Sequence, residues 1–230
     1  MQARRREALT ITDAEAFIRA NTRLRPVPHV PEISLHVADE AVPLWQKTEE
    51  ELGQMGLPPP FWAFAWAGGQ ALARYILDHP ETVKQRRVLD LASGSGLVGI
   101  AAAMAGAAEV IANDIDTFAI SAIALNAEAN KVSLQSETFD RLDARMPLEH
   151  FGTVLAGDIF YERDTAARAF SFLQRMQAQG ARVLVGDPGR SYLPKDEMHV
   201  LAEYTVPVSR DLEDAEIKRT RVWSLGPAPT

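Results

Sequence analysis

Residues 88–99 read Val-Leu-Asp-Leu-Ala-Ser-Gly-Ser-Gly-Leu-Val-Gly, and this stretch decides the fold. Its first four residues are mostly apolar and typical of a short buried strand, and an apolar, helix-like segment begins at Leu97. Between the two, Gly94, Gly96 and Gly99 fit the pattern G-x-G-x-x-G. A glycine turn that leaves a strand and opens a helix is typical of nucleotide-type cofactor sites, so we predict such a site here.

Strands and helices alternate along the chain around that turn. Seven segments are predicted as strands, at residues 88–91, 110–112, 133–139, 154–156, 182–186, 198–209 and 217–225. Helices are predicted at residues 70–78, 97–105, 117–130 and 165–178. This alternation predicts an α/β fold with a doubly wound, mostly parallel seven-stranded sheet. Because no helix separates the last two strands, we expect them to form an antiparallel C-terminal hairpin at one edge of the sheet.

Residues 1–59 have an irregular sequence, without the alternation of strands and helices that is predicted for the rest of the chain. Thr12 and Glu15 have the spacing of a helix capping box. The elements predicted in this part are helices over residues 13–23 and 45–55, a short strand over residues 33–37 and a stiff proline joint at residues 58–60. We therefore expect an N-terminal helical and irregular extension over residues 1–59, packed on an α/β domain over residues 60–230.

The composition is that of an ordinary globular protein. The chain has 230 residues, of which 47% are hydrophobic and 24% are charged, and its net charge is −7. The absence of cysteine excludes thiol catalysis, disulfides and Cys-based zinc sites. The five histidines show no paired ligand spacing, so no metal site is predicted. The acidic balance argues against a general nucleic-acid binder.

No segment is suited to crossing a membrane or to secretion. The longest apolar stretch, residues 96–108, is too short to span a bilayer and is typical of a buried core helix. The arginines at residues 4–6 are not followed by an apolar region, and the acidic residues after them are unusual in a mitochondrial leader. We expect a soluble protein without a membrane partner, located in the cytoplasm, or in the mitochondrial matrix if the source is eukaryotic.

Two kinds of cofactor use such a glycine turn, the nicotinamide dinucleotides and S-adenosylmethionine (SAM). Both are served by an acid after the second strand that binds ribose hydroxyls, so Asp114, twenty residues after Gly94, does not separate them. Asp90 distinguishes the two cofactors, because a carboxylate beside the turn would repel a diphosphate but can balance the positive charges of the sulfonium and ammonium of SAM. Asp90, Gly94, Gly96 and Asp114 are therefore candidate SAM-binding residues. A nicotinamide-dependent oxidoreductase is the alternative.

Five stretches carry a resemblance to known proteins. Residues 88–96 and Ala-Asn-Asp-Ile-Asp at 112–116 look like the first two motifs of class I, seven-strand methyltransferases. Three others are similar to one branch of that class, the protein-lysine methyltransferases of family 16: Pro-Phe-Trp-Ala-Phe-Ala-Trp-Ala-Gly-Gly-Gln at 60–70, Gly-Asp-Ile-Phe-Tyr at 157–161 and Gly-Asp-Pro-Gly-Arg at 186–190. The resemblance spans about residues 60–226. It implies a Rossmann-like sheet, SAM as the cofactor, and methyl transfer to a protein lysine, with the electron transfer flavoprotein β-subunit as the implied substrate.

The same resemblance implies roles for individual residues. Asp158 and Tyr161 match the family's D-x-x-Y/F motif, so Asp158 would accept a hydrogen bond from the lysine ammonium and Tyr161 would form an aromatic wall beside it. Trp66 resembles the tryptophan that covers the cofactor pocket. From their positions after strands, Asp140 could contact the adenine amino group and Arg190 could meet an acidic patch on the substrate.

The sequence leaves open alternatives to the function and to the residue roles that the resemblance implies. A small-molecule methyltransferase on the same scaffold would carry the same cofactor motifs, although no large insertion between residues 154 and 182 covers the cleft, and an open cleft suits a protein side chain better. Trp66 and Tyr161 could be core aromatics, and Arg190 a solvated loop residue. A binding module that keeps only the fold is disfavoured because the set of carboxylates is intact.

Overall fold

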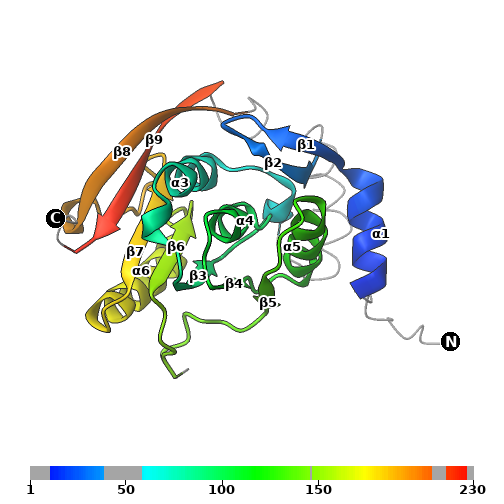
Figure 1. The fold of residues 1–230 in the computed structure, drawn as a ribbon. Helices are drawn as coiled ribbons and strands as arrows, with labels where there is room; N and C mark the ends of the chain where they lie inside the picture. Colours follow the sequence, from blue (N-terminus) through cyan, green and yellow to red (C-terminus); the bar gives the residue numbers. More distant parts are fainter. Residues whose placement is uncertain (1–10, 39–58, 146, 209–215, 227–230) are drawn as a thin grey trace, which may run out of the picture.

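The computed structural model describes residues 11–38, 59–145, 147–208 and 216–226, and these residues contain a seven-stranded sheet in the order β5-β4-β3-β6-β7-β9-β8. Its strands are β3 (Arg87–Leu91), β4 (Glu109–Asn113), β5 (Gln135–Glu137), β6 (Thr153–Gly157), β7 (Arg182–Asp187), β8 (Met198–Pro207) and β9 (Ile217–Leu225). The first five run parallel, and β9 lies antiparallel between β7 and the edge strand β8. The predicted sheet and its C-terminal hairpin are confirmed (Figure 1).

Helices cover both faces of the sheet. Figure 1 shows α3 (Ala67–Asp78), α4 (Leu97–Met104) and α5 (Thr117–Ala129) side by side over one face, and α6 (Arg163–Ala178) over the other. Side chains alternate along β3: Val88 packs in a cluster with α3 and α4, whereas Leu89 packs in a second cluster with α6. Because both faces of the parallel strands are buried, their sequences are apolar runs rather than alternating patterns.

Residues 11–37 pack against α5. They form α1 (Ile11–Asn21) and a hairpin of β1 (Arg23–Val27) and β2 (Val30–Val37), with Ile18 of α1 packed in one cluster with Phe118 of α5. Two side-chain amides, of Asn126 in α5 and of its C-cap Asn130, hydrogen-bond to β2: Asn130 accepts from the Ser34 N–H at 2.9 Å, and Asn126 accepts from the His36 N–H at 2.7 Å. The hairpin is thus attached to a helix of the sheet domain through polar as well as apolar contacts.

Some predicted elements differ from the observed ones. Helix α1 begins at Ile11, so Thr12 lies within the helix and is not its N-cap. Strand β1 was not predicted because it contains Pro26; a two-stranded ribbon tolerates proline, and the register shifts there. The helix predicted around residues 45–55 and the first residue of the proline joint lie outside the described residues. The described residues also contain three short 3-10 helices: η1 (Phe61–Ala63), η2 (Pro80–Thr82) and η3 (Lys195–Glu197). No helix in the described part is long and apolar enough to cross a membrane.

Two glycines bring α3 close to the ends of β6 and β7. A Cβ added to Gly68 would collide with the carbonyl oxygen of Gly186 and with the carboxylate of Asp158, and a Cβ on Gly186 would collide with the Gly68 carbonyl. The backbones can therefore meet only without side chains at these positions. This contact sets the N-terminus of α3 against the carboxyl ends of the two strands.

We expect Gly68→Ala to destabilise the fold, whereas the neighbouring Gly69→Ala should be tolerated. An added methyl at Gly68 meets backbone, which cannot move aside, so the free energy of unfolding should fall by about 1–3 kcal/mol or more. At Gly69 the nearest atoms would lie 3.8 Å away, an ordinary contact distance. Urea denaturation of both variants measures the difference, and equal stability of the two would contradict the close-contact interpretation.

Candidate active site

The glycine turn after β3 is held by a buried carboxylate. Gly94 and Gly96 have φ of +54° and +85°, the left-handed region that favours glycine, and Gly96 is the N-cap of α4. Asp90 is 1% exposed, and its Oδ2 accepts hydrogen bonds from the Gly99 N–H at 2.8 Å and from the Ser93 hydroxyl. The N-terminus of a helix favours a negative charge. Burial nevertheless raises the pKa of Asp90 to about 7.

Two acids follow β4. Asp114 accepts a hydrogen bond from the Gly94 N–H at 2.8 Å, so it contacts the glycine turn directly, and burial raises its pKa. Its other oxygen accepts from the Asp116 N–H at 3.0 Å. Asp116 is the N-cap of α5 and accepts from the Phe118 N–H at 2.9 Å. Burial, and then the charge of Asp114, raise the pKa of Asp116 to about 6.

Asn126 connects the turn to the N-terminal hairpin. Its Nδ2 donates a hydrogen bond to the Ser95 carbonyl at 2.7 Å, while its Oδ1 accepts the bond from the β2 backbone described above. The residue is fully buried, so an unpaired amide would be costly. The position of the glycine turn therefore depends in part on residues far upstream in the chain.

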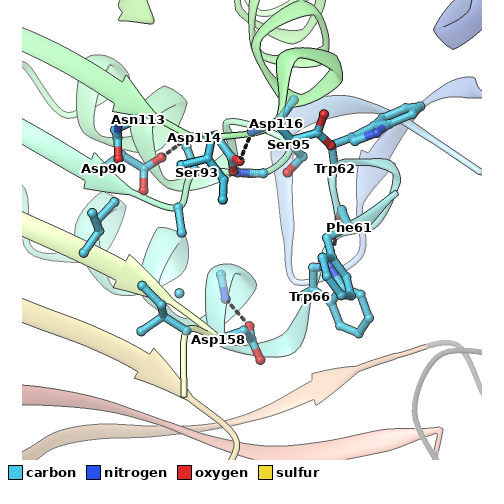
Figure 2. Close-up of a pocket in the computed structure, with 18 of the residues that line it drawn as sticks. Phe61, Trp62, Trp66, Asp90, Ser93, Ser95, Asn113, Asp114, Asp116 and Asp158 are labelled. Carbon is cyan, nitrogen blue, oxygen red and sulfur yellow. Dashed lines mark hydrogen bonds between the residues drawn. The ribbon is translucent and has the colours of Figure 1, made fainter. Parts of the chain in front are cut away.

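Asp158 follows β6 on the opposite half of the sheet from β4. Its φ is +54° and it is 8% exposed. Its Oδ2 accepts a hydrogen bond from the Gly69 N–H, at the N-terminus of α3, at 3.0 Å. Its Oδ1 accepts from Nη2 and Nε of Arg190 at 2.8 and 3.2 Å. Figure 2 shows the carboxylates of Asp90, Asp114 and Asp158 around one pocket.

Three aromatic residues, here called the aromatic rim, line the same pocket: Phe61, Trp66 and Tyr161. The Nε1 of Trp66 donates to the Phe61 carbonyl at 2.9 Å, and the Phe61 ring lies 5.9 Å from Trp66 and 5.4 Å from Tyr161, between ring centroids. Tyr161 is 50% exposed. Trp62 and Phe64 also line the pocket, but both are buried, and Trp62 stacks on Phe118 with centroids 6.2 Å apart.

These groups enclose a cavity of about 460 Å³, a size typical of small-molecule sites. Five aspartates line it: Asp90, Asp114, Asp116, Asp140 and Asp158. Each of the three arginines in the lining has a carboxylate partner among the described residues: Arg141 with Glu137 and Glu149, Arg168 with Asp140, and Arg190 with Asp158. The cavity is therefore acidic, and the positive charges of its three arginines are already compensated by ion pairs.

The residues present fit SAM. Its sulfonium and ammonium are cations, which an acidic cavity favours and a diphosphate-binding site would not. Asp114 offers carboxylate oxygens that can accept from ribose hydroxyls, and the glycine turn leaves open space beside it, since a Cβ on Gly94 would find its nearest neighbour 4.0 Å away. Ile115, an exposed apolar side chain in the lining, was not singled out from the sequence because its neighbours on the chain are polar.

Asp140 and Arg190 have partners that the sequence did not reveal. Asp140 lines the cavity, but its side chain is about half exposed and its Oδ2 pairs with Arg168 at 2.6 Å. The interpretation of Arg190 as a solvated loop residue is wrong, because its side chain is 21% exposed and pairs with Asp158, whereas its contact with an acidic patch of the substrate stays a prediction. The cap formed by Asp116 was also missed, although an Asp before a helix is a recognised start signal.

A solved structure shares this fold. The chain matches the 16S rRNA N2 G1207 methyltransferase of Thermus thermophilus in complex with AdoMet (SAM) and guanosine, with a TM-score of 0.50, 22% identity, and coverage of 70% of this chain and 43% of that one. This likeness shows that the sheet has the Rossmann-like fold found in class I methyltransferases. The profile described as lysine methyltransferase matches residues 48–202, and the chain belongs to this family.

Relatives extend the match over almost the whole chain. The electron transfer flavoprotein beta subunit lysine methyltransferase of Rattus norvegicus is 36% identical over 93% of this chain and 84% of its own length. The homolog of that protein in Caenorhabditis elegans is 35% identical over 86% of this chain and 90% of its own length. The chain is thus a SAM-dependent protein-lysine methyltransferase, which confirms the family resemblance and decides against the small-molecule and nicotinamide alternatives.

Stability should depend on pH through Asp116. Its pKa is about 6 in the folded state against 3.8 for the ordinary group, so the folded state binds the proton more tightly. The stability that follows from this is fully present below pH 4 and is lost as the pH rises to about 6. Asp116→Asn keeps the helix cap and has no carboxyl group to ionise. The free energy of unfolding of this variant relative to wild type should therefore increase by up to about 3 kcal/mol between pH 4 and pH 7.

Urea denaturation at several pH values, without cofactor, measures this difference. Asp164→Asn, at an exposed position in the first turn of α6, is the matched control and should show no such growth. A difference between Asp116→Asn and wild type that stays constant with pH would contradict the prediction.

Proposed function

We propose that this enzyme methylates lysine side chains of the electron transfer flavoprotein β-subunit. The observation that carries the proposal is the match to a lysine methyltransferase named for that substrate over 93% of the chain. A protein acceptor rather than a nucleic acid also agrees with the net charge of −7 and with a cavity whose arginines are paired to carboxylates.

The cofactor half of the cavity is proposed to lie between the glycine turn and the end of β4. Gly94 and Gly96 carry no side chains at their two positions in the turn, Asp114 would bind the ribose hydroxyls, and Asp90 would shape the turn and add negative charge near the cationic end. Trp66 would cover the pocket, and Asp140 would contact adenine at its edge. When bound, SAM supplies an electrophilic methyl group.

The acceptor half is proposed to lie at Asp158 and the aromatic rim. A lysine with a pKa near 10.4 must become neutral before it can act as a nucleophile, which costs about 4 kcal/mol near pH 7.4. Asp158 would accept a hydrogen bond from the amine and orient its lone pair, and Tyr161 would exclude water beside it. Alignment of the two reactants supplies about 7–11 kcal/mol and is the main task of such a site.

We propose a division of the chain as well. Residues 60–230 would form the catalytic domain, and residues 1–59 an extension packed on it. The contacts of β2 with Asn126 and Asn130 support this division, because they attach the extension to α5 rather than to the sheet itself.

Incubation with labelled SAM and purified electron transfer flavoprotein tests the substrate. We expect label on lysine residues of the β-subunit, located by mass spectrometry. A lysate from cells lacking this enzyme, compared before and after its addition, identifies any other acceptor. If the cofactor binds and the flavoprotein stays unlabelled while another protein is modified, the proposed substrate is wrong and the lysine chemistry stands.

Asp158→Asn should lower methyl transfer by at least a hundredfold and leave the affinity for S-adenosylhomocysteine within about threefold, because Asp158 belongs to the acceptor half. Initial rates and calorimetry measure the two effects. Asp164→Asn, an exposed neighbour on α6, is the matched control and should behave as wild type. Retained transfer in Asp158→Asn would remove Asp158 from the proposed role.

A further inference from the structure

Arg190 lies inside the proposed acceptor site. Its guanidinium donates two hydrogen bonds to one oxygen of Asp158, at 2.8 and 3.2 Å, and its central carbon lies 5.6 Å from the centroid of the Trp66 ring. It lines the cavity together with both residues. A charge-assisted pair supported by an aromatic face has a defined geometry, in contrast to a surface arginine.

The backbone before Arg190 is fixed by a buried acid. Asp187, the last residue of β7, is 1% exposed, and its Oδ1 accepts hydrogen bonds from the N–H groups of Gly189 at 2.6 Å and Arg190 at 2.7 Å. Gly189 has φ of +95°, which a glycine adopts without strain. The turn therefore points the arginine back toward the end of β6, where Asp158 lies.

The ion pair between Arg190 and Asp158 changes the charge that an incoming lysine side chain encounters in the acceptor site. A carboxylate without a counter-charge would hold the lysine as an ammonium, and an ammonium has no lone pair with which to accept a methyl group. Here the charge of Asp158 is compensated by Arg190 on one oxygen and by the N-terminus of α3 on the other. The carboxylate keeps its hydrogen-bonding geometry without attracting a second cation strongly.

We propose that Arg190 is a positioning residue that compensates the charge of Asp158, so that the acceptor site binds the substrate lysine as a neutral amine. The proposal rests on the proposed role of Asp158 as the amine acceptor. The amine releases its proton to solvent before transfer, its nitrogen forms the new bond to the methyl carbon, and the carbon–sulfur bond of the donor breaks.

Other charged groups lie near the pair, and Asp187 is itself affected by Arg190, whose charge opposes the rise in pKa that burial causes in Asp187. Asp187 lies on β7, Asp114 follows β4, and Glu162 begins α6 beside Tyr161. Asp140 and Arg168 compensate each other across the cavity, and the first turn of α3 carries no acidic residue. Loss of Arg190 raises the pKa of Asp187 further, and a protonated Asp187 offsets part of the lost positive charge, so a change in pH dependence that remains reports the loss of the Arg190 cation.

The test is the dependence of kcat on pH, with the acceptor protein identified by the labelling experiments above. In Arg190→Gln the rising limb should move to higher pH by about one unit or more, because a cation near the amine is lost. The value of kcat at neutral pH should then fall about tenfold or more, while its plateau at high pH stays close to wild type. Arg190→Lys, which keeps the charge, should leave the limb within about half a unit of wild type.

Control variants and a binding measurement distinguish the proposed role of Arg190 from a general effect of removing a cation and from an effect on cofactor binding. Arg163→Gln removes a cation that stacks over Tyr192 and should leave the limb in place. S-adenosylhomocysteine affinity, measured by calorimetry, should be unchanged in Arg190→Gln, and Arg190→Met is a second variant if the first does not fold. The proposal is overturned if Arg190→Gln lowers kcat equally at every pH without moving the rising limb, or if it raises only KM.

The variant Asp158→Asn tells the two proposals apart. If Asp158→Asn is active, the proposed role of Asp158 as the amine acceptor is wrong. If Asp158→Asn is inactive while Arg190→Gln keeps the wild-type limb, only the proposed role of Arg190 is wrong.

Discussion

The hydrogen bond from the Gly99 amide to the buried carboxylate of Asp90 holds the centre of this structure together. It ties the end of β3 to the first turn of α4, and so it sets the path of the glycine turn between them. A buried carboxylate is costly unless it is hydrogen-bonded, and the N-terminus of a helix is one of the few places that offers free amides. The remaining site is arranged around that turn: Asp114 binds its Gly94 amide, and Asn126 binds its Ser95 carbonyl.

The second half of the site depends on a different constraint, the close approach of α3 to β6 and β7. Because Gly68 and Gly186 lack side chains, the N-terminus of α3 reaches Asp158 and donates to it. In both halves a buried acid meets the amides of a helix terminus, at α4 for Asp90 and at α3 for Asp158. The site therefore holds several carboxylates in a small volume, where uncompensated charges would repel one another.

Much of the fold could be predicted from local patterns. The strand at residues 88–91, the glycine turn and the helix after it agree with the sequence because apolar runs, turn residues and helix formers all indicate the same path. Strand β1 could not be predicted, since Pro26 is unfavourable in most strands and only its place in a two-stranded ribbon makes it acceptable. The attachment of β2 to α5 was equally hidden, because it depends on hydrogen bonds between residues about ninety positions apart.

The sequence by itself determined the class of fold, the cofactor turn and the set of acids at the ends of the parallel strands, because these follow from the order of residues along the chain. Only the tertiary structure decided what each acid contacts. The charge of Asp90, interpreted from the sequence as a counter-charge for the cofactor, is used first by the turn itself. Arg190, for which the sequence predicted either a contact with an acidic patch of the substrate or a solvated position, forms an ion pair with Asp158. Partners of this kind come from separate strands and meet only when the sheet has formed, so no local pattern contains them.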